Sequence, residues 1–326
     1  MHGFRIARRG HCGDRGGAAR GRRSQQRDAR PRVAAMSNPA SGIIAFVNAF
    51  KPAGMSSAHL VARVRRLFDR APTGHFGTLD PNAAGVLPLA IGGATRLLPY
   101  IESRGKSYTF VLRLGMSTTT ADQWGDVRAA AAVPSDWRQR LESVRERFLG
   151  EISQIPPMVS ALKHQGRRLY EFARKGEEIA RKARTVRIDR LDILGYEENA
   201  VRLAVDCSEG TYVRTLCEDL AHAIGTEGCL AALLRTRAGP FTLSMARMLD
   251  EIESDPSVCI TSPLDVLSLP NVVLEEPSVS DFRAGRMVPL PERVEARHAF
   301  VLDSGRSPVG VGENLGALLQ PRKVFT

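Results

Sequence analysis

The chain has 326 residues, 43% hydrophobic and 25% charged, a composition typical of a soluble globular protein of about two domains. Its longest stretch without a charge, Val33 to Phe50, is too polar and too interrupted by Gly and Pro to span a bilayer, which excludes a membrane protein. The net charge is +11, but ten Arg and two Asp among residues 1–35 account for +8. The rest of the chain carries only +3, so its local charge patches are more informative than the total.

The N-terminal segment, residues 1–40, is predicted to be a disordered basic tail, because it is rich in Arg, Gly and Ala and lacks apolar periodicity. Three interpretations of it stay open. It could be an arm that attracts RNA, or a transit peptide, although Ser24 is the only hydroxyl residue among its first 35. The interpretation we favour is that Met36 is the true start of the protein.

The first predicted elements alternate between strand and helix. Residues 43–48 are predicted as a strand, and Ser56 or Ser57 can cap a helix that carries apolar residues from Leu60 to Phe68. A loop is expected at Gly74–Gly77. Residues 106–114 alternate apolar and polar side chains like a half-buried strand.

The second half of the chain continues this pattern. Ser135 is predicted to open a helix that Gly150 closes, and residues 201–205 form a strand. A turn at 208–211 leads into a helix that ends at Gly225. Because strands and helices do not follow a regular βαβ rhythm, an α+β fold is expected. A Pro- and Ser-rich linker at 256–270 precedes a small β domain.

Cysteine and histidine usage predicts a cytoplasmic protein without a metal site. The five cysteines are odd in number and form no C-x-x-C pair, which is typical of reduced thiols. The seven histidines show no metal-ligand spacing. The cysteines are Cys12, Cys207, Cys217, Cys229 and Cys259.

The most unusual segment of the chain surrounds Asp80. An Asp before a Pro is a common helix start, so Asp80 could be an N-cap with Pro81 in the first helical position. A capping Asp, however, needs neither glycines on both sides nor a His five residues earlier. Glycines allow close approach of a backbone or a ligand, and a loop carboxylate followed by Pro can be presented to a substrate.

The string GHFGTLDPNAAGVLPLAIGGATR, residues 74–96, resembles the signature of the TruB family of tRNA pseudouridine synthases. Further segments resemble the family in the same order along the chain, so that the resemblance covers Gly42 to the C-terminus. An ordered set of motifs is far more specific than any one of them. These segments are KPAGMSS (51–57), KSY (106–108), QIPPMVSALK (154–163), GRRLYEFAR (166–174), CSEGTYVR (207–214) and RTRAGPF (235–241).

The resemblance implies a fold and a division into domains. It implies a pseudouridine synthase fold with a central mixed, largely antiparallel sheet in a catalytic domain at residues 41–255. Residues 256–326 then comprise the linker and a small PUA-like β-barrel that binds RNA.

The resemblance also implies a reaction, the isomerisation of a uridine in the T arm of tRNA, at position 55. The base is detached from its ribose, rotated and rejoined through C5, without a cofactor or a metal. One carboxylate is required, either to attack the sugar or to deprotonate it, and Asp80 is implied to be that group. Because an enzyme cannot reach this bond inside a base stack, the nucleotide must be flipped out, which costs a few kcal/mol.

Two further catalytic residues are implied. Arg214 resembles the family's partner of the carboxylate, since a nearby opposite charge favours the ionised form. For an arbitrary Arg in this position, a solvent-facing helical residue would be the simpler interpretation. Tyr108 resembles the tyrosine that stacks on the flipped base and is a candidate general base, although the strand pattern alone indicates a core residue.

The substrate contacts are implied in the same way. His75 resembles the histidine that helps to open the T loop, and Tyr212 and Leu233 resemble residues that line the pocket. Residues 163–187 hold nine Lys and Arg against three Glu, and the family's tRNA-gripping insertion falls on this segment. Lys51, Lys163, Arg167 and Arg168 are the basic residues expected to contact the substrate.

Several positions depart from the family pattern, and none of them touches Asp80, Tyr108 or Arg214. Phe50 stands where Asp is usual, and Arg96 where Lys is usual. Phe76 replaces a small residue beside His75, and Leu234 replaces an Arg. We therefore expect activity, with tRNA as the partner, no protein partner and no membrane, in a monomeric protein.

Two other functions compete with this one. The chain could be a catalytically inert module of the same fold that binds or folds tRNA. It could also be a relative of the archaeal and eukaryotic type that a separate RNA guides, but the bacterial-style insertion and the short C-terminal domain argue against that.

Overall fold

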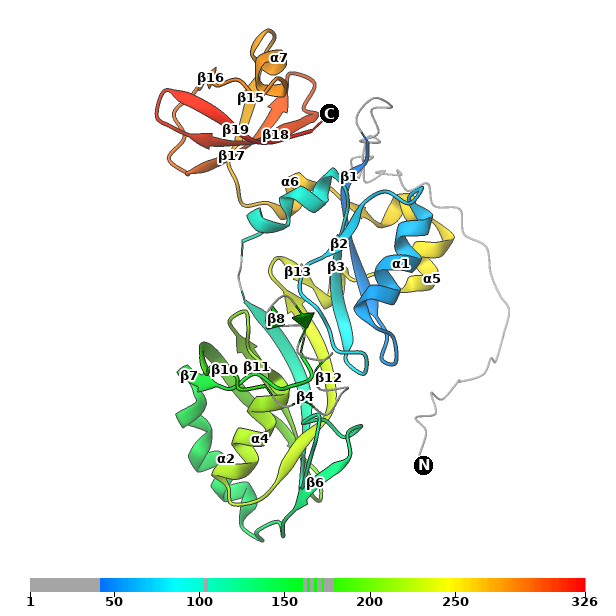
Figure 1. Cartoon of the computed structure of the whole chain (residues 1–326), viewed down its shortest axis with the longest axis vertical. Helices are drawn as coiled ribbons and strands as arrows, with labels where there is room; N and C mark the ends of the chain where they lie inside the picture. Colours follow the sequence, from blue (N-terminus) through cyan, green and yellow to red (C-terminus); the bar gives the residue numbers. More distant parts are fainter. Residues whose placement is uncertain are drawn as a thin grey trace, which may run out of the picture. The chain divides into compact units, whose positions relative to one another are not determined.

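Figure 1 shows the computed structural model of the chain. It describes residues 42–102, 105–160, 163–164, 167–168, 172, 177 and 179–325, with only the backbone at 163–164 and 167–168. The predicted N-terminal tail, residues 1–40, lies outside the described residues.

The main sheet is mixed and has ten strands. Its central order is β14-β1-β3-β12-β4-β11-β10-β7, with β2 on β3 and β13 on β12. The β3–β12 pair is parallel and the other pairs are antiparallel, which confirms the predicted largely antiparallel sheet. Its strands are β1 (Ile44–Lys51), β2 (Thr73–His75), β3 (Ala84–Gly92), β4 (Lys106–Leu114), β7 (Gly150–Gln154), β10 (Arg184–Tyr196), β11 (Ala200–Cys207), β12 (Gly228–Ala238), β13 (Phe241–Thr242) and β14 (Ile260–Thr261).

Helices and short hairpins surround this sheet, and none of the helices in the described part of the chain is long and apolar enough to cross a membrane. The α-helices are α1 (Ser57–Leu67), α2 (Trp137–Arg145), α4 (Val213–Ala223), α5 (Leu249–Ser254) and α6 (Pro263–Val266). The 3-10 helices are η1 (Gly93–Tyr100), η2 (Glu146–Phe148), η3 (Leu243–Met245) and η4 (Pro256–Cys259). The hairpins are β5 (Met116–Thr118) with β6 (Val127–Ala130), and β8 (Lys163–His164) with β9 (Arg167–Arg168).

The core follows from the alternation within the strands. On β4, Tyr108, Phe110 and Leu112 point into one apolar cluster with the buried side chains of α2 and α4. Those two helices lie side by side in Figure 1. The buried face of α1, Leu60 and Val64, belongs to the same cluster. Both helical regions therefore share one core, and β3, β12 and β4 run between them.

Most predicted elements agree with the structure, and two local predictions were wrong. The strand at 106–114 and the helix from Val213 are confirmed. Part of the predicted loop at Gly74–Gly77 pairs with β3 as strand β2, because Thr73 and His75 extend the sheet. The helix predicted to end at Gly150 ends at Arg145 and continues as η2, and Gly150 (φ +78°) begins β7 instead.

The C-terminal region contains a second, smaller β-sheet, in the part of the chain where small β structure was predicted. It comprises β15 (Asn271–Leu274), α7 (Ser278–Arg283), β16 (Val288–Pro289), β17 (His298–Asp303), β18 (Pro308–Asn314) and β19 (Leu318–Val324). The five strands form a separate sheet, in the order β15-β17-β18-β19-β16, around an apolar cluster that contains Val272, Phe282 and Val301. The predicted linker at 256–270 is mostly structured, because β14 pairs with β1 and α6 packs on the main sheet.

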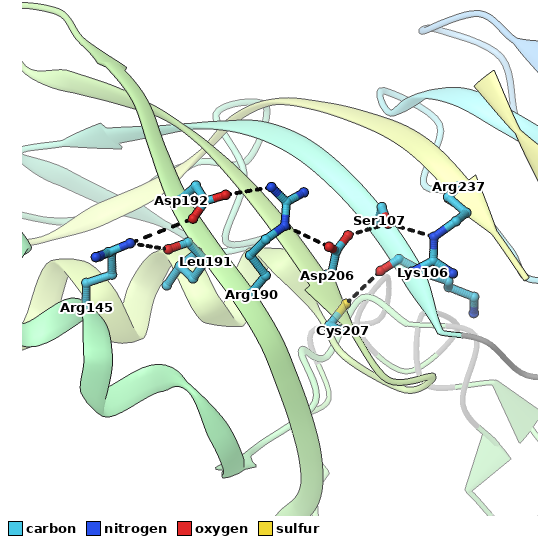
Figure 2. A network of polar contacts seen from close by, with 9 residues as sticks. All are labelled: Lys106, Ser107, Arg145, Arg190, Leu191, Asp192, Asp206, Cys207 and Arg237. Carbon is cyan, nitrogen blue, oxygen red and sulfur yellow. Dashed lines mark hydrogen bonds and ion pairs between the residues drawn. The ribbon is translucent and has the colours of Figure 1, made fainter. Parts of the chain in front are cut away.

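Along the main sheet, side chains that point away from the core form a row of polar contacts (Figure 2). Arg190 on β10 bonds Asp192 at 2.6 Å and Asp206 at 2.8 Å. Asp206 accepts a hydrogen bond from Ser107 on β4, which in turn accepts one from Arg237 on β12 at 3.0 Å. Exposed pairs of this kind contribute little to stability, typically about 0–1 kcal/mol each. They satisfy the charges of this face of the sheet.

Candidate active site

A cavity of about 270 Å³ lies between the loop that precedes β3 and the N-terminus of α4. It brings together five of the residues predicted from the sequence: Asp80, Tyr108, Tyr212, Arg214 and Leu233. These come from four parts of the chain that are far apart in sequence. The remaining lining residues are Thr78, Leu79, Lys106, Ser160, Gly210, Thr211 and Val213.

Asp80 and Arg214 form a two-point ion pair. Arg214 Nε lies 2.9 Å from Asp80 Oδ2, and Arg214 Nη2 lies 3.2 Å from Asp80 Oδ1. Arg214 also donates to the carbonyl oxygens of Thr120 (2.8 Å) and Val159 (2.7 Å). The guanidinium is held by two loops as well as by its carboxylate, so it is a buried residue of the first turn of α4 and not a solvent-facing one.

The backbone around Asp80 is fixed by neighbours from β1 and α1. Ser57 Oγ donates to the Leu79 carbonyl at 2.9 Å and accepts from the Leu79 amide at 3.0 Å. Lys51 Nζ donates to the Pro81 carbonyl at 3.0 Å. Residues 81–82 form a turn, and β3 begins at Ala84. Asp80 is therefore not a helix cap, and its carboxylate is free to face the cavity.

Arg235 on β12 organises the same loop from the other side, and sequence reasoning did not single it out. Its guanidinium is fully buried and donates to the carbonyls of Val86 (2.8 Å), Thr78 (3.2 Å) and Gly77 (2.9 Å). The sequence does contain one indication of this position. Arg235 follows Leu233 by two residues on the same strand, so both side chains lie on the same face.

The two glycines that flank Asp80 are required by their positive φ angles and by the close approach of Arg235 and Lys106. A Cβ on Gly85 (φ +113°) would lie 2.2 Å from the Arg235 carbonyl oxygen, where β3 and β12 pair in parallel. A Cβ on Gly77 (φ +79°) would lie 3.0 Å from Lys106 Nζ and 3.4 Å from Arg235 Nη1. Both glycines thus allow side chain and backbone to close around the loop that carries Asp80.

Tyr108 belongs both to the core and to the cavity wall. It is 8% exposed and packs in the main apolar cluster. Burial raises the pKa of its phenol to about 12, and Arg235, to which the phenol is hydrogen-bonded, acts in the opposite direction. The hydroxyl is consequently protonated throughout the physiological pH range.

Lys106 and Tyr212 complete the polar lining. Burial lowers the pKa of Lys106, as does the nearby charge of Arg235, and Glu209 lies 3.9 Å from its Nζ. Burial also raises the pKa of Tyr212. The backbone of Tyr212 is held by Gln154, which accepts from its amide at 3.0 Å and donates to its carbonyl at 3.3 Å.

Two other predicted substrate-binding residues, Lys51 and His75, are not among the described residues that line the cavity. Lys51 is fully buried, and its Nζ also donates to the carbonyls of Pro52 (2.9 Å) and Met55 (2.6 Å), so its ammonium does not face solvent. Burial lowers its pKa to about 8. His75 lies on β2, opposite Leu89. For Lys163, Arg167 and Arg168 the structure gives only a two-stranded backbone, and their side chains lie outside the described part.

The departures from the family pattern lie away from the cavity. Phe76 packs against an apolar cluster, with Gly239 beside its ring. Leu234 pairs with Thr109 and belongs to the strand positions that alternate with Leu233 and Arg235. Phe50 pairs with Val86 on β3. Arg96 donates to the Val324 carbonyl at 2.7 Å.

Among the described residues, no group of three His, Cys, Asp or Glu side chains is arranged to hold a metal ion. What the cavity offers chemically is a carboxylate paired with a fixed guanidinium, an aromatic ring and an apolar side chain. Together with the mixed α+β sheet, this arrangement fits the class of pseudouridine synthases.

Comparison with known proteins identifies the family. Residues 65–213 match the model of the TruB family pseudouridylate synthase, N-terminal domain. A tRNA pseudouridine synthase B of Heliobacterium mobile is 40% identical over 290 residues, 86% of this chain and 94% of the relative. One of Pseudomonas paraeruginosa is 42% identical over 272 residues, 81% and 89% of the two chains. The chain belongs to the TruB family of pseudouridylate synthases.

Solved structures confirm the predicted fold. A chain from a structure of an H/ACA RNP bound to a substrate RNA containing 2'-deoxyuridine has a TM-score of 0.63 and 22% identity, and covers 89% of this chain and 91% of its own. A chain from a Cbf5-Nop10-Gar1 complex has a TM-score of 0.63, 24% identity and the same coverage. At these identities the likeness concerns the fold.

Proposed function

We propose that the protein isomerises uridine to pseudouridine in tRNA, at the T-loop uridine at position 55. The observation that carries this proposal is the paired Asp80 and Arg214 in a cavity with Tyr108 and Leu233. Curated relatives of about 40% identity over most of the chain are named tRNA pseudouridine synthase B, which supports tRNA as the substrate.

The target nucleotide enters the cavity flipped out of its stack. The cavity that receives it has a volume of about 270 Å³. Unstacking costs a few kcal/mol and is least expensive in a loop, which favours the T loop over a duplex. Tyr108 stacks on the flipped base, and Leu233 and Tyr212 enclose it.

Asp80 acts at the ribose as an ionised carboxylate, either by attacking C1' or by removing a proton from the sugar. Both routes require a charged group, and the two-point pairing with Arg214 favours that charge when the bound RNA excludes water. Because the other Arg214 donors are engaged by backbone carbonyls, the guanidinium stays in place throughout the reaction.

Tyr108 serves mainly as a stacking platform. With a pKa of about 12 its phenol is neutral at physiological pH. A neutral phenol is a weak base, which favours stacking and hydrogen bonding over proton abstraction. The Arg235 guanidinium holds the hydroxyl in place.

Affinity for the RNA comes from outside the cavity. We assign Lys163, Arg167 and Arg168 to phosphate contact, because they belong to residues 163–187, which hold nine Lys and Arg against three Glu. Residues 41–255 form the catalytic domain in this proposal, and the sheet within 256–326 is a second RNA-contacting domain. Residues 1–40 are not required.

The test is chemical mapping of pseudouridine on an unmodified tRNA transcript incubated with the pure protein. Modification confined to the T-loop uridine, absent from a transcript with cytidine at that position, is expected. Modification elsewhere would contradict the assigned position. Binding without any modification would favour an inert tRNA-binding module, and activity that requires an added guide RNA would favour the guided type of relative.

A further inference from the structure

We propose that Trp124, on the loop between β5 and β6, stacks on a nucleobase of the substrate RNA that neighbours the uridine in the cavity. This inference rests on the proposed function and adds to it a base contact outside the pocket. The Trp124 side chain is 51% exposed. Among the described residues, it belongs to none of the three apolar clusters.

The loop that carries Trp124 is held by its own hydrogen bonds. The Thr119 amide donates to the Asp126 carbonyl at 2.9 Å, and the Gly125 amide to the Asp122 carbonyl at 3.3 Å. Asp122 Oδ1 accepts from Thr120 Oγ1 at 2.6 Å and from the Trp124 amide at 3.2 Å. Because this backbone is already ordered, binding has to order only the side-chain torsions of the indole, which lowers the entropic cost of the contact.

The same loop contacts Arg214, one member of the pair in the cavity. The Thr120 carbonyl accepts from Arg214 Nη1 at 2.8 Å. Gly125 packs directly on Thr120, because a Cβ on Gly125 would lie 2.8 Å from the Thr120 amide nitrogen. Trp124 therefore directly precedes Gly125, which contacts Thr120, the residue whose carbonyl binds Arg214.

A second link ties the loop to the strand that lines the cavity. The Gln123 amide donates to the Leu230 carbonyl at 2.9 Å, and Gln123 Nε2 donates to the Ala231 carbonyl at 2.7 Å. Both acceptors lie on β12, just before Leu233. Trp124 is thus adjacent in the chain to two anchors, one at Arg214 and one on the strand that carries Leu233, so its loop is held beside the site.

The chemistry of the loop selects a base as the ligand of Trp124. Two carboxylates, Asp122 and Asp126, flank the tryptophan and would repel a phosphate. A flat indole stacks well on any base, and such stacking is worth about 1–3 kcal/mol per base, or about 5- to 150-fold in affinity. The other tryptophan, Trp137, is 2% exposed and packs against Tyr196, so the two residues serve different purposes.

Because the chain has only two tryptophans, fluorescence tests the proposal directly. In the variant Trp137→Phe, Trp124 is the only emitter. Binding of an unmodified T-arm hairpin RNA is expected to quench its emission and to shield it from iodide. In Trp124→Phe the remaining emitter, Trp137, is buried, and the same RNA is expected to change its emission little.

Affinity measurements separate stacking from charge. Trp124→Ala is expected to raise the Kd for the hairpin about 5- to 100-fold, without changing the slope of log Kd against log salt. Trp124→Phe is expected to recover most of the loss. A loss caused by damage to the Arg214 site would instead lower kcat at saturating RNA and would not be recovered by Phe.

The outcomes distinguish this inference from the proposed function. If the protein binds and modifies the RNA while Trp124 stays open to iodide and Trp124→Ala binds normally, the inference is overturned and the function stands. A change in the salt slope with Trp124→Ala would also overturn stacking. If the wild-type protein neither binds nor modifies the RNA, the proposed function and the inference both fail.

Discussion

Arg214 is 3% exposed, whereas the carboxylate that it pairs with, Asp80, keeps 39% of its side chain exposed. This asymmetry separates the two roles of the pair. The cation is fixed among backbone carbonyls of two loops, and the anion faces the cavity. A carboxylate held in this way can approach a ribose without leaving its counter-charge, which is the property that the proposed reaction needs most.

Replacing Arg214 by Lys should lower turnover more than RNA affinity. A lysine keeps the charge but cannot contact both carboxylate oxygens and two carbonyls at once. We expect kcat to fall at least about tenfold while the Kd for tRNA changes less than about threefold. Single-turnover kinetics and filter binding measure the two quantities. Unchanged turnover would refute the pairing, and Arg113→Lys, an exposed position on β4, is the matched control.

Lys51 should contribute to stability and not to phosphate binding. In Lys51→Met, the carbonyls of Pro52, Met55 and Pro81 lose the hydrogen bond from Lys51, which is expected to reduce the free energy of unfolding by about 1–3 kcal/mol in urea titrations. The salt dependence of tRNA binding should stay the same, because the ammonium does not face solvent. Arg167→Gln, in the basic segment, should lower the salt slope by about one instead. If Lys51→Met reduced the slope of the salt dependence, Lys51 would contact a phosphate, as expected from the sequence.

Arg235 is expected to act as a positioning residue for the loop of Asp80. Arg235→Lys cannot reach the three carbonyls and the Tyr108 hydroxyl together, so that the loop shifts relative to Arg214. Because small misplacements of reacting groups are costly, kcat should fall about 10- to 100-fold with little change in KM. Arg237→Lys makes the same substitution two residues later. An irregularity of the strand between the two residues pairs Arg237 with Ser107 and so places it on the other face of β12, and this variant should leave kcat within about twofold. Equal effects of the two substitutions would remove the special role of Arg235.

Asp219 on α4 should make stability depend on pH. Burial, and to a smaller degree the charge of Glu218, raises its pKa from 3.8 to about 6. The folded state therefore binds the proton more tightly than the unfolded state, and this stabilisation is lost as the pH rises through about 6. Asp219→Asn should be more stable than the wild type by about 1–3 kcal/mol at pH 8 and by much less at pH 4. A gain independent of pH, or one shared by the exposed Asp250→Asn, would contradict this origin.

The sequence predicted the elements whose pattern is local. Strand 106–114 has a strict alternation, and the helix after Tyr212 has a clear apolar face ended by Gly225, so both were found within a residue or two. The end of the helix near Gly150 was missed, because η2 extends the helical apolar spacing to Phe148 without being part of α2.

The site was predicted only as far as its motif residues. Family resemblance brought Asp80, Tyr108, Arg214, Tyr212 and Leu233 together, and all five line one cavity. The hydrogen bonds of Lys51 and Arg235 could not be predicted from the sequence. Each side chain donates to backbone carbonyls of a loop that only tertiary packing brings near. Arg235 and Val86, for example, are 149 residues apart in the chain.

The most direct test of the central claim is pseudouridine formation by Asp80→Asn on an unmodified tRNA transcript, measured beside the wild type. Asn keeps the shape of the side chain but removes its charge. We predict that the variant binds the transcript with nearly unchanged affinity and forms no pseudouridine, while the wild type modifies the T-loop uridine. If Asp80→Asn retains full activity, the carboxylate held by Arg214 is not the catalytic group.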